Sequence, residues 1–357
     1  MTNSFWRNKK VFITGHTGFK GSWLSLWLQQ LGAYVIGFSL ESPSEPNLFT
    51  VANVARGMQN IHGDIRNFAL LQQTLNTHHP DIVFHMAAQS LVQHSYEYPI
   101  ETYATNVMGT ANLFEAARHC PSVKVIVNVT SDKCYENKEW DWGYREHEPM
   151  GGYDPYSSSK ACAELITTAY RQSFLNPQTV DQHGKALASV RAGNVIGGGD
   201  WAKNRLIPDI IRAFIANESV LIRNPKAIRP WQHVLEPLAG YLLLAEKLWQ
   251  HPAKFSEAWN FGPHEQDIQP VQFIADRLTQ RWGNGAHWIQ DKNTFAHEAQ
   301  TLKLDIAKAK NRLAWTPRMN LEKALDYVAD WYRAWQQQQD MRKFTLTQIE
   351  QYIGDKQ

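Results

Sequence analysis

The sequence has few cysteines and no long apolar segment. Its three cysteines, Cys120, Cys134 and Cys162, are scattered and are not spaced as pairs of metal ligands. Neither a disulfide framework nor a metal site is therefore supported. The longest apolar runs end well before the length that crosses a membrane, and no apolar region precedes the first predicted strand as it does in a signal peptide. We expect a soluble protein of a reducing compartment, the cytoplasm, without a membrane partner.

The sequence also lacks an excess of charge of either sign. Its 357 residues include 36 lysines and arginines against 34 aspartates and glutamates, interspersed along the chain, for a net charge of +2. Nucleic-acid binding requires a basic stripe, so no nucleic-acid partner is expected. The chain is long enough to form two domains, or one domain with a sizeable appendage.

What the sequence does have is a glycine turn near its N-terminus. Gly15, Gly18 and Gly21 separate an apolar strand predicted at 11–13 from a helical pattern that closes at Gly32. This spacing lets backbone amides at a helix N-terminus reach a pyrophosphate. A side chain at these positions would clash with the ligand or with the packing of helix on strand. The turn therefore predicts a bound dinucleotide.

Apolar strands alternate with helices over the first part of the chain. Strands are predicted at 34–38, around Ile61, and at 81–85, 123–129 and 186–190, with helices at 68–75, 101–119 and 156–174. The alternation predicts an α/β fold, a doubly wound parallel sheet with right-handed crossovers.

The pattern changes after the three glycines at 197–199. The elements become shorter and mixed: helices are predicted at 206–217, 237–250, 271–281 and 321–335, a strand at 220–222, and an exposed helix face at 336–339. We assign 1–196, with returning segments near 228–257, to the dinucleotide-binding domain. The remaining segments, 197–227 and 258–357, are assigned to a smaller, mixed α/β substrate-binding domain.

Functional groups of an open parallel sheet collect at the carboxyl ends of its strands. Asp64 follows the third strand and could accept a hydrogen bond from an adenine amino group, or it could cap the next helix. Ala87 and Ala88 follow the fourth strand and are small enough for a cofactor to lie against them. These strand ends are expected to converge on one crevice.

Tyr156 and Lys160 form the strongest constellation. A spacing of four residues places the phenol and the ammonium one turn apart on one helix face. The lysine cation, together with an oxidised nicotinamide, would favour the phenolate and lower the tyrosine pKa. Such a tyrosine could remove a proton from a hydroxyl as hydride leaves its carbon. The alternative is an ordinary tyrosine and lysine on a helix surface.

These motifs resemble those of the extended short-chain dehydrogenase/reductase superfamily, with Thr14-Gly15-x-x-Gly18-x-x-Gly21 followed by Tyr156-x-x-x-Lys160. Stretches beginning at Thr105, Arg191 and Arg229 resemble its nucleotide-sugar branch. The resemblance covers most of the chain and implies a tightly held NAD, reduced and reoxidised within one turnover. The residues expected to contact NAD are Gly15, His16, Gly18, Phe19, Lys20, Gly21, Asp64, Ile65, Ala87, Ala88, Thr105, Val129, Tyr156 and Lys160.

The stretch after the fifth strand indicates the reaction. At this place nucleotide-sugar 4-epimerases carry Ser or Thr without a following acid/base pair, and dTDP-glucose 4,6-dehydratases carry Thr-Asp-Glu. Here the stretch reads Ser131-Asp132-Lys133, which, with the glycine turn, is similar to the CDP-D-glucose 4,6-dehydratases. Those enzymes lie on the route to the 3,6-dideoxyhexoses of bacterial O-antigen. A strand-end turn with an exposed ion pair is the structural alternative.

The resemblance implies a role for each of these residues. Tyr156, assisted by Ser131 and Lys160, would deprotonate the sugar 4-hydroxyl as hydride moves to NAD. Water is then lost across carbons 5 and 6, and the hydride returns to carbon 6. Asp132 is expected to be the acid, with a pKa raised by burial. Lys133 is either the carbon-5 base, which we favour, or a cation that stabilises the enolate while Asp132 handles the protons.

One departure concerns the grip on the cofactor. An NAD-binding Rossmann unit usually ends its second strand in an acid that holds the adenosine ribose. Here the strand ends in Ser39 and Leu40, and Glu41 lies beyond the expected position. His16 and Lys20 could contact phosphate or ribose instead. The hypothesis is that NAD is held less firmly than in relatives that have the acid.

The residues expected to contact the sugar nucleotide are Gln89, Asn194, Arg205, Leu206, Arg223, Arg229 and Asn260. Arg229 resembles the diphosphate-binding arginine of the family and suits bidentate contact; Arg223 falls near the expected base. Both could instead be solvated surface arginines. None of these residues distinguishes CDP from dTDP by its own chemistry, so the cytidine assignment rests on resemblance.

Three other functions remain open at this point: a nucleotide-sugar 4-epimerase, a dehydratase of another nucleotide sugar, and a non-catalytic NAD-binding regulator. Relatives dimerise by packing the helix at 106–117 and the helix after Tyr156 into a four-helix bundle. Both helices here have enough apolar residues for two faces, so a homodimer is expected.

Overall fold

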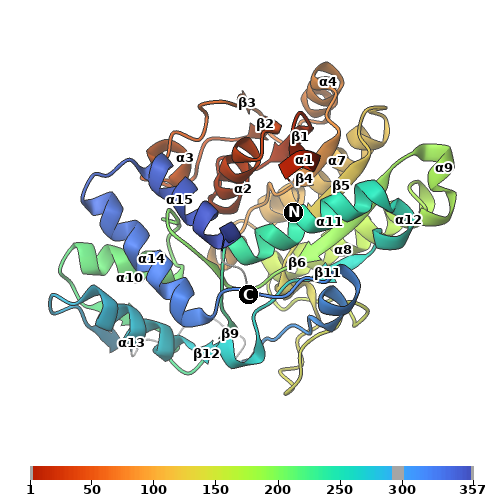
Figure 1. Ribbon diagram of the computed structural model, residues 1–357. Coiled ribbons are helices and arrows are strands. Elements are labelled where there is room, and N and C mark those ends of the chain that lie inside the picture. Colours follow the sequence, from red (N-terminus) through yellow and green to blue (C-terminus); the bar gives the residue numbers. More distant parts are fainter. Residues whose placement is uncertain (1–2, 292–300, 355–357) are drawn as a thin grey trace.

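The computed structural model describes residues 3–291 and 301–354, and its centre is a parallel sheet of seven strands (Figure 1). The strand order is β11-β6-β5-β4-β1-β2-β3, and every neighbouring pair is parallel. The strands are β1 (Lys10–Thr14), β2 (Tyr34–Ser39), β3 (Gln59–His62), β4 (Ile82–His85), β5 (Val125–Val129), β6 (Ala186–Arg191) and β11 (Ala258–Asn260). The strand order reverses at β1, between β2 and β4, which is where ligands bind in such sheets. The predicted doubly wound fold is confirmed.

Helices cover both faces of the sheet, because alternate strand residues are apolar on both sides. Val11 and Ile13 pack in the cluster that includes α2 (Phe19–Gln30) and α11 (Leu235–Gln250). Phe12, between them, packs in the opposite cluster with α4 (Phe68–His78) and α7 (Gly109–Arg118). The long helix α8 (Pro155–Ser173) lies on this second side through Ile166 and Tyr170. The buried strands are thus held from two sides and carry the site at their ends.

The helix predicted at 101–119 is divided into three parts. It begins as α6 (Pro99–Tyr103), continues through a π-helical turn at Ala104–Met108 and ends as α7. π-Turns of this kind often mark functional positions. Here the turn includes Thr105, which is predicted to contact the cofactor, and the buried Asn106.

The second part of the chain forms small paired strands and helices beside the sheet, at the lower left of Figure 1. Its elements include β7 (Val195–Ile196), α10 (Leu206–Ile215), β8 (Val220–Ile222), β9 (Ile228–Pro230), β10 (Gln232–His233), β12 (Ile268–Pro270), α13 (Val271–Trp282), β13 (Trp288–Gln290) and α14 (Leu321–Gln336). Strands pair as β10–β7, β12–β9 and β13–β8. A last helix, α15 (Met341–Gly354), packs against α2 through the contact of Tyr352 with Trp27.

Two expectations about this part need correction. Strand β11 belongs to the main sheet, although 258–357 was assigned to the substrate-binding domain. This three-residue strand was too short to recognise from periodicity. Helix α14 ends at Gln336, so the glutamines at 337–339 lie in the following turn and not on a helix face. The rest of the division into two domains stays a prediction.

None of the helices in the described ranges is long and apolar enough to cross a membrane.

Candidate active site

A cavity of about 1410 Å³ opens at the carboxyl ends of the strands, beside the point where the strand order reverses. Most of the predicted site residues line it: Gly15, Gly18, Phe19, Lys20, Gly21, Asp64, Ile65, Ala87, Ala88, Gln89, Thr105, Val129, Ser131, Asp132, Lys133, Tyr156, Lys160, Asn194, Arg205, Leu206, Arg223 and Arg229. His16 and Asn260 do not. The structure therefore brings residues from every predicted strand end into one space.

The glycine turn has the shape that a dinucleotide diphosphate needs. Gly15 has a φ of +75°, and a Cβ there would lie 2.7 Å from the Cα of Ala87. A Cβ on Gly21 would overlap the carbonyl oxygen of Gly15. Gly18 is the N-cap of α2 and offers no side chain to the first amides of that helix. Those amides and the positive end of the helix suit an anionic diphosphate.

His16 is turned away from the cavity. Its side chain is fully buried, with Nε2 2.6 Å from Oδ1 of Asn60 on β3 and the ring against Phe49. The ring fills the space left by Gly37 on β2, where a Cβ would overlap it. Burial lowers the His16 pKa, so the ring is neutral. The predicted contact of this side chain with phosphate or ribose is wrong.

The end of β2 holds a pair of hydroxyl groups where NAD-binding Rossmann units usually have an acid. Thr17 Oγ1 lies 2.9 Å from Ser39 Oγ and 2.9 Å from the carbonyl oxygen of Leu40. Thr17 and Ser39 both line the cavity. These neutral groups can contact a ribose hydroxyl, but they lack the charge that strengthens such a bond.

Asp64 lines the cavity at the end of β3. Its carboxylate accepts from the backbone N–H of Arg66 at 2.8 Å and from its guanidinium, which holds the Asp64 pKa below its ordinary value. The helix-cap alternative is wrong, because Asn67 caps α4 by accepting from the N–H of Leu70 at 3.1 Å. The contact of Asp64 with adenine stays a prediction.

Tyr156 and Lys160 face the cavity from the first turns of α8, which Asp154 caps by accepting from Ser157 N at 2.9 Å. Burial raises the Tyr156 pKa to about 12, although a hydrogen bond from Ser131 acts in the opposite direction. Burial also lowers the Lys160 pKa to about 8, assisted by the nearby Lys20. The predicted lowering of the Tyr156 pKa is therefore not produced by the protein itself, because desolvation of the phenolate outweighs its neighbours.

Ser131, Asp132 and Lys133 follow the end of β5, after Thr130. Ser131 caps a short 3₁₀ turn, accepting from Lys133 N at 3.2 Å and donating to Asp132 Oδ1 at 3.1 Å. Asp132 is 3% exposed, and burial raises its pKa even though Lys133, Arg229 and Lys20 act against the rise. This is the direction that an acid requires. Among the residues that the structure describes, none bonds the other carboxylate oxygen, Oδ2.

Three arginines also line the cavity. Arg229 is 5% exposed and lies near Asp132, so it is not a solvated surface arginine. Arg205 pairs with Asp200 at 3.0 Å and donates to Ser90 Oγ at 2.9 Å. Arg223 is half-buried at the cavity wall. Such guanidinium groups suit a diphosphate.

Asn260 is a structural residue and does not line the cavity. Its side chain donates to the carbonyl oxygens of Tyr144 at 2.8 Å and Asp305 at 3.1 Å, and accepts from Tyr135 Oη at 2.8 Å. It joins the segment after the 3₁₀ turn to the C-terminal part of the chain. The predicted contact of Asn260 with the sugar nucleotide is wrong.

The fold, the glycine turn and the tyrosine–lysine helix together define a short-chain dehydrogenase/reductase. A family model described as GDP-mannose 4,6 dehydratase matches residues 12–328, and the chain belongs to this family.

Two curated relatives match over nearly the whole chain. A CDP-glucose 4,6-dehydratase from Salmonella typhimurium is 55% identical over 351 residues, covering 98% of each chain. A dTDP-glucose 4,6-dehydratase from Xanthomonas campestris is 26% identical and covers 90% of this chain and 92% of its own.

Solved structures show the same fold at lower identity. The dTDP-glucose 4,6-dehydratase of Bacillus anthracis in complex with NAD has a TM-score of 0.76 at 22% identity, over 93% of this chain and 98% of that one. The UDP-glucose 4-epimerase of Thermotoga maritima with UDP-glucose has a TM-score of 0.80 at 22% identity, over 92% and 99%. The fold alone thus does not separate dehydratase from epimerase.

Proposed function

We propose that the protein is a hydro-lyase that converts CDP-D-glucose into CDP-4-keto-6-deoxy-D-glucose and water, with NAD as its cofactor. The observation that carries this function is that Asp132 and Lys133 meet Tyr156 in one cavity. An epimerase needs the tyrosine but has no use for the other pair. The cytidine nucleotide is supported by the relative that is 55% identical over the whole chain.

The residues at the point where the strand order reverses fit NAD. Its diphosphate would be held by the N-terminus of α2 and by the glycine turn of Gly15, Gly18 and Gly21. Bound there, NAD supplies a hydride acceptor for carbon 4 of the sugar and a hydride donor for carbon 6. Asp64, Ile65, Ala87 and Thr105 line the same part of the cavity and would lie along the cofactor.

Tyr156 is the group that takes the proton of the 4-hydroxyl. The hydrogen bond with Ser131 acts to lower the Tyr156 pKa, and with it the cost of the phenolate, and Lys160 donates a 3.4 Å hydrogen bond to the carbonyl oxygen of Val129. Because burial alone disfavours the phenolate, these groups and the positive charge of the oxidised nicotinamide must supply the driving force.

Asp132 and Lys133 complete the reaction by removing water across carbons 5 and 6. Burial raises the Asp132 pKa, which favours the protonated form that can donate to the departing 6-hydroxyl. Lys133 would take the proton from carbon 5 in its neutral form. The second possibility, a charged Lys133 that stabilises the enolate, is tested in the Discussion.

Incubation with CDP-, dTDP-, GDP- and UDP-hexoses tests the proposed substrate. A 4-keto-6-deoxy product is expected from CDP-glucose at the highest kcat/KM. A product that forms fastest from another nucleotide sugar would contradict the cytidine assignment but not the reaction. A 4-epimer as the product would contradict the reaction.

The affinity for NAD should depend on the residue at the end of β2. Ser39→Asp places a carboxylate where the ribose-holding acid is expected, and charge-assisted hydrogen bonds should tighten NAD binding by about tenfold. Calorimetry of the wild type and the variant measures the difference. Wild-type protein that purifies with full, non-exchanging NAD would contradict the hypothesis of a weaker grip.

Gly193 lies directly beside Oδ2 of Asp132, the carboxylate oxygen without a hydrogen bond among the described residues. A Cβ on Gly193 would overlap Asp132 Oδ2. Gly193→Ala should therefore displace the acid and slow the loss of water by about 10- to 100-fold, with reduced cofactor accumulating in a single turnover. The buried Gly262 is the control, since an added methyl meets nothing nearer than 3.3 Å. Equal rates of water loss in both alanine variants would contradict the role of Asp132.

The helices α6 to α8 leave apolar side chains uncovered, with Ile100 80% exposed, Met108 57%, Leu165 58% and Phe174 50%. This supports the homodimer expected from a four-helix bundle of α7 and α8, and sedimentation equilibrium of the wild type tests it.

The proposed reaction would serve 3,6-dideoxyhexose synthesis for O-antigen in the cytoplasm. Measuring O-antigen sugars after gene deletion tests that placement.

A further inference from the structure

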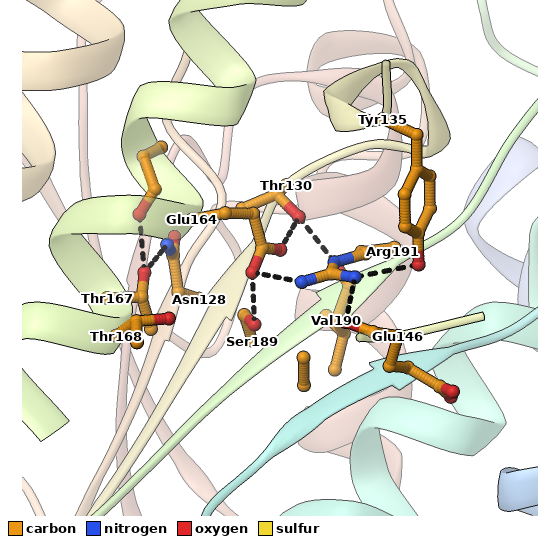
Figure 2. A network of polar contacts seen from close by, with 12 residues as sticks. Asn128, Thr130, Tyr135, Glu146, Glu164, Thr167, Thr168, Ser189, Val190 and Arg191 are labelled. Atoms are coloured by element: carbon orange, nitrogen blue, oxygen red, sulfur yellow. Dashed lines mark hydrogen bonds and ion pairs between the residues drawn. The ribbon is translucent and has the colours of Figure 1, made fainter. Parts of the chain in front are cut away.

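A buried ion pair joins Glu164 of α8 to Arg191 at the end of β6 (Figure 2). Glu164 and Arg191 approach to 2.8 Å, with side chains only 1% and 4% exposed. The carboxylate of Glu164 also accepts from Thr130 Oγ1 at 2.5 Å and from Ser189 Oγ at 2.7 Å. Neither charged residue lines the cavity.

The contacts of this pair hold the catalytic segment at both ends. Thr130, which binds Glu164, immediately precedes Ser131. Arg191 donates from Nη1 to Tyr135 Oη at 2.7 Å and to the carbonyl oxygen of Glu146 at 2.9 Å, and lies over the Tyr135 ring. Tyr135 follows the 3₁₀ turn that ends at Cys134. The segment 131–134 is thus fixed before its first residue and after its last.

The same pair fastens this segment to α8. Glu164 stands four residues after Lys160 and eight after Tyr156, on the helix face turned toward the sheet. Figure 2 shows Glu164 pointing from the helix toward Thr130, Ser189 and Arg191 on the strand ends. The distance between the tyrosine helix and the acid/base turn therefore depends on these bonds.

The charge state fits this arrangement. Burial by itself would raise the Glu164 pKa, but Arg191 and the hydrogen bonds outweigh it and hold the pKa below its ordinary value. A buried ion pair is weak evidence for stability, because apolar residues of similar volume can be as stable. A positional role accounts for the charged pair better than a contribution to stability does.

We propose that Glu164 and Arg191 are positioning residues that set the segment 131–134 against Tyr156. The proposal rests on the proposed function, since it assumes that both elements act on one sugar. Glu164 acts through Thr130, and Arg191 acts through Tyr135. Neither touches the substrate.

Glu164→Gln tests the proposal with CDP-glucose and the full-length protein. The amide has one acceptor oxygen where the carboxylate has two, so it cannot accept from Thr130 on one side and from Ser189 and Arg191 on the other. The turn should shift, and kcat should fall by about 100-fold while KM for CDP-glucose stays unchanged. Thr130→Val, which loses the hydroxyl's bonds to Glu164 and to the carbonyl oxygen of Val190, should lower kcat in the same way by about tenfold. This milder variant keeps the test valid if Glu164→Gln does not fold.

Glu236→Gln is the matched control. Glu236 is also fully buried and accepts three bonds, from the N–H groups of Arg318 and Met319 and from Tyr352 Oη, but it lies away from the cavity. The Glu236→Gln substitution should lower the melting temperature without changing kcat. Folded Glu164→Gln and Thr130→Val that keep wild-type kcat would overturn the proposal. Wild-type protein without turnover in the same assay would instead overturn the proposed function.

A double-mutant comparison separates positioning from general destabilisation. In the Lys133→Met background, Glu164→Gln should slow product formation much less than it does in the wild type, because both act on the same step. Additive effects of the two substitutions would overturn the proposal.

Discussion

Lys133→Met is expected to leave the first hydride transfer intact and to stop the reaction before water is lost. Methionine keeps the length and apolar stem of lysine but can neither take nor hold a proton. Product formation should fall by about 100-fold or more, the range of a lost general base. After mixing with CDP-glucose, the near-ultraviolet absorbance of the reduced nicotinamide should appear and persist.

Lys133→Arg distinguishes the two roles that are open for this residue. Arginine keeps the charge but stays protonated at any working pH, so it cannot act as a base. If Lys133 is the base, the arginine variant should stall like the methionine variant; if it stabilises the enolate, water loss should be retained. Lys310→Met, an exposed lysine outside the cavity, is the control. Complete loss of hydride transfer in Lys133→Met would instead assign Lys133 to orienting the sugar.

Tyr156→Phe is expected to abolish the step that Lys133→Met preserves. Without the phenol no group takes the proton of the 4-hydroxyl, and hydride transfer should slow by about 10²- to 10⁴-fold. No reduced nicotinamide should accumulate, even though the sugar nucleotide still binds. Tyr170→Phe is the control, since Tyr170 lies on the same helix and donates to Glu115 at 3.2 Å, away from the cavity. A Tyr156→Phe variant that reduces its cofactor at the wild-type rate would contradict the assignment.

The role of Tyr156 as a base also predicts how the rate of hydride transfer changes with pH. A base works when deprotonated, and the Tyr156 pKa is raised to about 12 by burial while the hydrogen bond from Ser131 acts to lower it. Hydride transfer should therefore become faster as the pH rises. Ser131→Ala removes the opposing hydrogen bond, so the profile should shift further to the alkaline side. A shift toward acid would contradict this account of Ser131.

Local spacing was sufficient to predict much of the fold and the cavity. The glycine turn is defined by residues three apart, and the tyrosine–lysine pair by residues four apart on one helix. Both place their groups without information from distant segments. Asp132 could be predicted for a similar reason, because it stands three residues after the end of a buried strand in a parallel sheet.

The errors concern properties that depend on distant partners. The direction of the His16 ring depends on the space above Gly37 and on Asn60, and the position of Asn260 depends on Tyr135 and Tyr144. No local pattern carries that information. In the protein without its cofactor, the Tyr156 pKa is raised because of burial, which is set by the whole fold.

Glu164 was missed although a local signal existed. It lies four residues after Lys160, so the helix face that carries the catalytic pair continues into an acidic residue directed at the sheet. An acidic residue on such a face needs a partner. The identity of that partner, Arg191, could be known only from the pairing of β5 with β6.

The fate of a label at carbon 4 tests the central claim most directly, namely that Asp132 and Lys133 turn an oxidation at carbon 4 into a loss of water. CDP-glucose that carries deuterium at carbon 4 would be converted by the wild-type protein, and the product would be examined by NMR. The account predicts a 4-keto-6-deoxy product with the deuterium at carbon 6. Deuterium returned to carbon 4 of an epimeric sugar that keeps its 6-hydroxyl would contradict it.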